Sequence, residues 1–162
     1  DSLAGVLPTI RSRCISFAVA PVSPEDCARY CTAQGVGAKD AALYSALFDG
    51  HIGTVLAAAR DEARREQVDR ALALAKAAAA RDSYAAAVLL AAYEKDKAGA
   101  SALLADFRAV AAAGLRDSPH SPVEGETARK ALGAADVAMQ QIGAQVNPKI
   151  VLSVLAAQFR TF

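Results

Sequence analysis

Apolar residues recur every three or four positions from about residue 23 to the end of the chain, which is the spacing of helices with one buried face. Ser23 and Pro24 mark the first helix start, because a serine hydroxyl caps free backbone amides and proline suits the first helical position. We expect this helix to run to about Gln34 and to end at Gly35, since glycine readily adopts the left-handed conformation of a helix end.

Two more short helices follow, over about residues 38–48 and from near His51 onward, separated by Asp49 and Gly50. The predicted apolar faces are Ala42, Leu43, Ala46 and Leu47 in the first of them and Ile52, Val55, Leu56 and Ala59 in the second. Three helices in about 40 residues make a small bundle that would be only marginally stable alone.

The remaining chain predicts four or five longer helices and a loop over residues 116–122, so the expected fold is mainly all-α. The charged segment "DEARRE" (61–66) is expected to be solvated, either as a linker or within a continuous helix. Asn147 and Pro148 are expected to cap the last helix. The apolar positions that define these helices are Val68, Leu72 and Ala75; Val88, Leu89, Ala92 and Tyr93; Leu103, Leu104, Phe107 and Val110; Leu132, Ala135, Met139 and Ile142; and Val151, Leu155 and Phe159, with Ile150 and Val154 beside them.

Composition narrows the possible functions. Lys and Arg number 18 against 17 Asp and Glu, so net charge gives no reason to expect attraction to nucleic acid or to an anionic membrane. No uncharged run of about 18 apolar residues occurs, and we therefore expect no membrane span. An odd count of 3 cysteines without a signal peptide indicates free thiols and a cytoplasmic location. A first residue of Asp rather than Met indicates a piece of a longer protein.

Few residues are of the types that catalyse reactions or bind metals or phosphates. His51 and His120 are the only histidines, and we expect them near a helix start and in a surface loop, with no catalytic triad. Cys27 and Cys31 share a helix face, but a structural zinc site needs four ligands, so we interpret them as core thiols and expect no metal. Because no phosphate-binding glycine loop occurs, we expect no cofactor and no enzyme activity in this chain by itself.

The stretch "LPTIRSRCISF" (7–17) stands apart from the helical pattern. Arg11 and Arg13 flank Ser12, Cys14 follows, and a short β-like run covers residues 15–19. A guanidinium is a permanent cation whose planar fork of donors fits phosphate oxygens. An arginine at the edge of one subunit is thus suited to stabilise charge on a nucleotide held by a neighbouring subunit.

Several landmarks in this order resemble the AAA+ clamp-loader family. "LPTIRSRC" resembles the Ser-Arg-Cys motif that closes the ATPase base, and "ISFAVAPVSPEDCARYC" is similar to the last base strand and first lid helix. Residues 50–55 fall where the family has a glycine turn, and "VNPKIVLSVLAAQF" (146–159) is similar to the terminal collar helix of bacterial clamp loaders. The resemblance implies a remnant of the base over 1–20, a three-helix lid over 21–62 and a helical collar of about five helices over 63–162.

By the same resemblance, Arg13 is expected to act as an arginine finger in trans on a neighbour's ATP, with Ser12 and Cys14 supporting the motif. Arg11 has no assigned role. ATP-hydrolysing members carry a sensor arginine at the position of Gly53, so the resemblance is to the non-hydrolysing type of subunit. The implied partners are the gamma/tau and delta subunits through the collar, with DNA reached only through the assembled pentamer and no membrane contact.

Two alternatives stay open at this point. One is a fragment of the ATP-hydrolysing gamma/tau motor subunit, which an intact phosphate-binding loop upstream would favour. The other is an unrelated helical oligomerisation module without any link to nucleotides.

Overall fold

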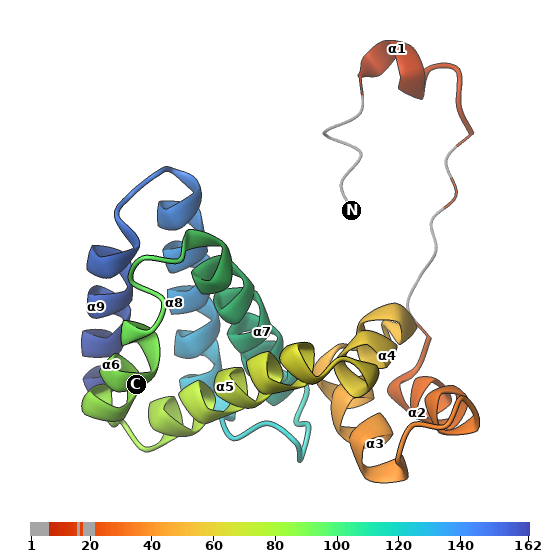
Figure 1. The fold of residues 1–162 in the computed structure, drawn as a ribbon, viewed down its shortest axis with the longest axis horizontal. Helices are drawn as coiled ribbons and strands as arrows, with labels where there is room; N and C mark the ends of the chain where they lie inside the picture. Colours follow the sequence, from red (N-terminus) through yellow and green to blue (C-terminus); the bar gives the residue numbers. More distant parts are fainter. Residues whose placement is uncertain (1–6, 16, 18–21) are drawn as a thin grey trace.

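The computed structural model describes residues 7–15, 17 and 22–162 (Figure 1). The β-like run at residues 15–19 lies mostly outside these residues, and the described part contains no strand. The prediction of a mainly all-α fold is confirmed. The helices are α1 (Pro8–Arg11), α2 (Pro24–Ala33), α3 (Ala38–Leu47), α4 (Ile52–Arg60), α5 (Glu62–Ala79), α6 (Ser83–Ala91), α7 (Lys97–Leu115), α8 (Gly125–Gly143), α9 (Pro148–Gln158) and the short 3₁₀ helix η2 (Phe159–Thr161).

Local capping signals place the helix ends as expected. The Ser23 hydroxyl accepts a hydrogen bond from the Asp26 amide at 3.1 Å at the start of α2, and Gly35 follows the helix with φ of +87°. At the start of α9, the Asn147 side chain accepts from the Lys149 amide at 3.0 Å. Both predicted caps are confirmed.

Gly50 allows the turn between α3 and α4 to approach the backbone that precedes α2. Its φ is +72°, and a Cβ at this position would lie 1.8 Å from the backbone oxygen of Val22. Only glycine fits this approach, so the turn holds α2, α3 and α4 together as one small group of helices.

The predicted apolar face of α3 is confirmed at Leu47 but not at its other three positions. Its fully buried residues are Ala41, Tyr44, Ser45 and Leu47. Ala42, Leu43 and Ala46 are only half-buried. Alanine and leucine occur all around this helix, so their spacing does not single out one face, and the large Tyr44 ring takes the interior position instead.

The same error affects α6. Of the predicted positions, Tyr93 is confirmed as buried and Leu89 is half-buried, but Val88 and Ala92 are exposed. The buried residues within α6 are Ala86 and Leu90. A helix made almost entirely of apolar residues leaves its orientation to be decided by its neighbours.

In the second half of the chain, α7 packs against both α5 and α8, and α6 packs against α9 (Figure 1). The predicted interior positions Leu103, Leu104, Phe107 and Val110 of α7 are confirmed as buried. The Phe159 ring lies 5.9 Å from that of Phe107 and 4.8 Å from that of Phe162, centroid to centroid. This aromatic cluster fixes the C-terminal end of the chain against the core.

Among the described helices, α7 alone is long and apolar enough to cross a membrane by length and composition, where the sequence led us to expect none. Half of its apolar window is buried inside the fold. A core helix passes the same test, and the packing of α7 between α5 and α8 is that of a core helix.

Candidate functional site

The Ser-Arg-Cys sequence forms an exposed turn directly after α1. The Ser12 hydroxyl donates to the backbone oxygen of Thr9 at 3.2 Å, and the Arg13 amide donates to that of Ile10 at 3.0 Å. Ser12 thereby ends the helix and fixes where the next residue leaves it. Ser12, Arg13 and Cys14 are all exposed, so the turn presents the three candidate residues together at the surface.

The Arg13 side chain is exposed. Within the described part of the chain, no carboxylate lies within ion-pair distance of it. The Ser12 hydroxyl is already bonded to the backbone, which is a structural role, and Cys14 is a free, exposed thiol. The side chain of Arg11 lies outside the described residues.

Gly53 lies in the first turn of α4, far along the chain from the Arg13 turn. It is exposed, and no atom lies within 4 Å of the position that a Cβ would take there. The chain therefore has room for a larger side chain at this position. The absence of a cation there is a property of the sequence and is not imposed by packing.

The expected places of both histidines and the burial of Cys27 and Cys31 are confirmed. His51 is exposed at the start of α4, with Nδ1 2.7 Å from the backbone oxygen of Phe48, and His120 lies in an exposed loop. Cys27 and Cys31 are buried free thiols. Burial, and then the neighbouring Cys27, raises the pKa of the Cys31 thiol. The described residues contain no cluster of histidine, cysteine and acidic side chains suited to a metal.

The expectation that residues 61–66 are solvated is wrong for Arg64. Its guanidinium donates through Nη1 and Nη2 to the two carboxylate oxygens of Asp106, the second bond measuring 2.6 Å. Gln67 donates to the same carboxylate at 2.8 Å. Asp106 is only 5% exposed, and Arg64 also lies over the Phe48 ring, 5.5 Å from its centroid. The hydrogen bond to Asp106 raises the pKa of Arg64.

This cluster joins α5 and α7 to the end of α3. A bidentate arginine–carboxylate pair fixes the relative geometry of its two helices. The sequence does contain a signal for it, because Asp106 interrupts the apolar run of α7 between Leu104 and Phe107. Its partner is 42 positions away in the sequence and follows from no local pattern.

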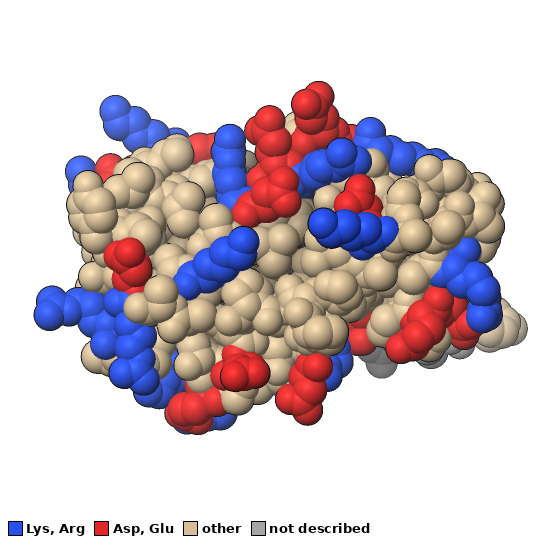
Figure 2. Space-filling view, turned by 90° about the horizontal axis from the view of Figure 1, so that it is seen from below, with Lys and Arg blue, Asp and Glu red and all other residues tan. Residues whose placement is uncertain are grey.

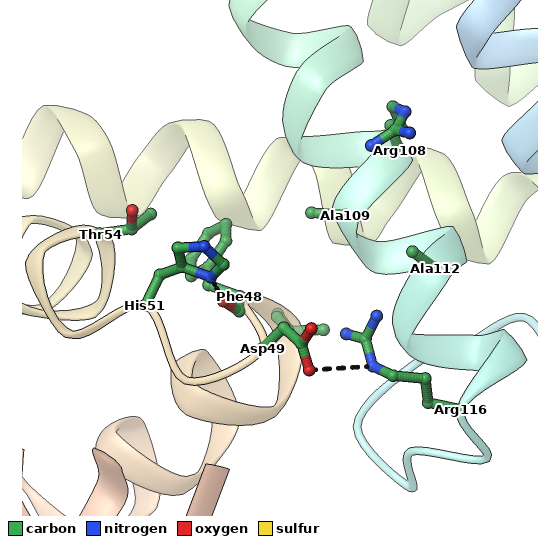
Figure 3. A pocket seen from close by; sticks show the side chains of 9 residues that line it. Phe48, Asp49, His51, Thr54, Arg108, Ala109, Ala112 and Arg116 are labelled. Carbon is green, nitrogen blue, oxygen red and sulfur yellow. Dashed lines mark hydrogen bonds and ion pairs between the residues drawn. The ribbon is translucent and has the colours of Figure 1, made fainter. Parts of the chain in front are cut away.

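A groove of about 340 Å³ separates the α3–α4 turn from α7 (Figure 3). On its rim, Arg116 Nε lies 3.5 Å from an Asp49 carboxylate oxygen, and Arg116 Nη2 donates to the Ala46 backbone oxygen at 3.3 Å. Arg108 Nε donates to Asp136 at 2.5 Å. The groove is lined by Leu47, Phe48, Asp49, His51, Thr54, Arg108, Ala109, Ala112 and Arg116.

A second surface feature lies on the paired helices α6 and α9, where four large apolar side chains are exposed. We call them the α6/α9 apolar face; they are Tyr84 (79% exposed), Val88 (56%), Ile150 (59%) and Val154 (49%). Spacings of four residues place each pair on one side of its helix. Exposed apolar side chains on two helices that pack against each other are candidates for contact with another protein.

The face drawn in Figure 2 shows no extended patch of positive or of negative side chains. Lysines and arginines alternate there with aspartates and glutamates, without an extended area of one sign. This mixed distribution matches the near-neutral net charge of the sequence.

Comparison of the chain with protein-family models, with curated proteins and with solved structures finds no match.

Proposed function

We propose that this chain is the lid and collar part of a non-hydrolysing subunit of a bacterial replicative clamp loader, similar to the delta-prime subunit of DNA polymerase III. In this role it helps to assemble, in the cytoplasm, the pentamer that loads the sliding clamp on primed DNA. The collar contacts the gamma/tau and delta subunits, and Arg13 reaches the ATP of a neighbouring motor subunit.

The observation that carries this proposal is the exposed Ser12-Arg13-Cys14 turn. An arginine finger must project from a fixed backbone without being neutralised by its own chain. Ser12 fixes the backbone through its bond to Thr9, and Arg13 has no carboxylate partner among the described residues.

Gly53 favours the non-hydrolysing subunit over the gamma/tau motor subunit. The resemblance places a sensor arginine of hydrolysing members at this position, and the structure has space for such a side chain. The sequence nevertheless has glycine, so this chain supplies no nucleotide-sensing cation from α4.

The test is reconstitution of the full parent protein with the other clamp-loader subunits, followed by measurement of ATP hydrolysis with clamp and primed DNA. Arg13→Ala is expected to reduce hydrolysis at one ATP site by roughly 10³-fold or more, the range of arginine-finger losses. Arg11→Ala is the matched control, since it removes the cation two residues before Arg13, at the end of α1. Full activity of the Arg13→Ala complex at every site would rule out the finger.

The α6/α9 apolar face supports a second candidate, a helical oligomerisation module unrelated to nucleotides. Both candidates place a protein partner on this face, but only the first gives Arg13 a role. Val88→Asp together with Ile150→Asp is expected to abolish the oligomer that this module forms. The mass of the oligomer is measured by light scattering after size exclusion. Leu115→Asp, which places one aspartate on an exposed apolar position of α7, is the control and is compared with each single substitution as well as with the pair. Assembly that survives the paired substitutions would rule out this face as the interface.

A further inference from the structure

The groove between the α3–α4 turn and α7 has the composition of a binding site. Its floor is apolar, made by Phe48, Ala109 and Ala112, and its ends carry the guanidinium groups of Arg108 and Arg116 (Figure 3). Grooves that combine an apolar surface with a few placed polar groups are the usual form of ligand sites.

Both guanidinium groups have hydrogen-bond donors to spare. Arginine has five N–H donors. Arg108 uses Nε on Asp136, and its side chain is 50% exposed. Arg116 donates through Nη2 to the Ala46 backbone oxygen, while its distance of 3.5 Å from Asp49 is long for a hydrogen bond. Each arginine is therefore able to accept an additional anionic group.

The spacing of the two arginines selects an extended ligand. Arg108, Ala112 and Arg116 are four residues apart in succession, so they form a stripe along one side of α7. The two arginine backbones are about 12 Å apart at a rise of 1.5 Å per residue. Side chains four residues apart on one face of an extended peptide are about 13 Å apart, with the second residue between them on the same face.

We propose that this groove binds an extended acidic segment of a partner protein, with two carboxylates four residues apart and an apolar side chain midway. The carboxylates pair with Arg108 and Arg116, and the apolar side chain lies over Ala109 and Ala112. On the opposite wall, His51 and Thr54 line the groove, and the His51 Nδ1 is in contact with the Phe48 backbone oxygen. This site does not depend on the clamp-loader proposal.

Asp49 offers a substitution that is expected to strengthen binding of the peptide. Its carboxylate lines the groove and competes with the ligand for Arg116. Removing its charge is expected to strengthen binding, whereas removing either arginine is expected to weaken it.

The experiment titrates the full chain into a fluorescein-labelled nonapeptide that has glutamates four positions apart, a leucine midway and otherwise serine and glycine, with anisotropy as the readout. The matched peptide has glutamines in place of the glutamates. Saturable binding of the glutamate peptide is expected, weakened about tenfold by Arg108→Gln or Arg116→Gln and strengthened several-fold by Asp49→Asn. Arg129→Gln, which removes an exposed arginine from α8, is the control and leaves binding unchanged.

Equal binding of the two peptides, or full affinity in both arginine variants, would overturn the proposal. The same holds if inorganic pyrophosphate binds with dependence on Arg108 while the glutamate peptide does not, since the groove is then a site for small anions. Arg108→Gln keeps the test valid if Arg116→Gln perturbs the fold, because Asp136, the partner of Arg108, is itself exposed.

Discussion

At the scale of single residues, Asp106 is the most consequential charged group in the described structure. It accepts hydrogen bonds from Arg64 and Gln67 while being 5% exposed. Asp106→Ala leaves the guanidinium of Arg64 partly buried without its partner, and we expect a loss of about 3–5 kcal/mol in the free energy of unfolding. Urea denaturation followed by circular dichroism measures this change.

The matched control is Asp136→Ala in α8. It breaks an exposed ion pair with Arg108, which lies on the same helix as Asp106. It is expected to change the free energy of unfolding by about 1 kcal/mol or less, since solvent screens exposed pairs. Losses of equal size in the two variants would contradict the special role of Asp106.

The raised pKa of the Cys31 thiol predicts that the free energy of unfolding depends on pH. Because burial raises its folded-state pKa above the ordinary value of 9.0, the unfolded chain loses the thiol proton first as pH rises. The contribution of this thiol is thus fully present below about pH 9 and is lost as pH rises from there through the folded-state pKa. Cys31→Ala is expected to flatten the decline in unfolding free energy above pH 9 relative to the parent chain. An unchanged slope would exclude this thiol as the source.

At the scale of helices, the boundaries followed from local signals and the buried faces did not. Ser23, Gly35 and Asn147 act on their own backbones, so their effects are readable from neighbouring residues. In α3 and α6, apolar residues surround the helix, and contacts with other helices decide which side turns inward. The groove and the Arg64–Asp106 pair were missed for the same reason, since each joins segments that are distant in the sequence.

The orientation of α6 is testable by truncating two large residues two positions apart. Leu90→Ala removes a buried side chain and is expected to lower the free energy of unfolding by about 2–5 kcal/mol. Val88→Ala removes an exposed one and is expected to change it by about 0.5 kcal/mol or less. The reverse order of effects, measured by urea denaturation, would mean that the periodic pattern of the sequence identified the face correctly.

At the scale of the whole molecule, the first helices and the later ones are physically continuous. Asp61 ends α4 and also caps α5, accepting from the Ala63 amide at 3.0 Å, and α3 packs against α7. We therefore expect residues 22–162 to unfold in one cooperative transition. Calorimetric and van't Hoff enthalpies that agree would support this, whereas two separate heat-absorption peaks would contradict it.

The sequence predicted the helical class, the order of the helices, the place of His51 near a helix start and that of His120 in a surface loop. The boundary between lid and collar at residues 62 and 63 stays a prediction, as does the role of Arg13. An arginine finger contacts a nucleotide on another subunit, so its role does not follow from contacts within one chain.

The contact of Phe48, Arg64 and Asp106 has a consequence for recombining this protein with others. Phe48 ends α3, whereas Arg64 and Asp106 belong to α5 and α7, so a single cut between α4 and α5 separates Phe48 from the other two residues. A chimera that joins residues 22–62 to the later helices of another protein would bring Phe48 without the cation that covers it. When the first helices are exchanged between proteins of this architecture, Phe48, Arg64 and Asp106 must therefore be transferred together.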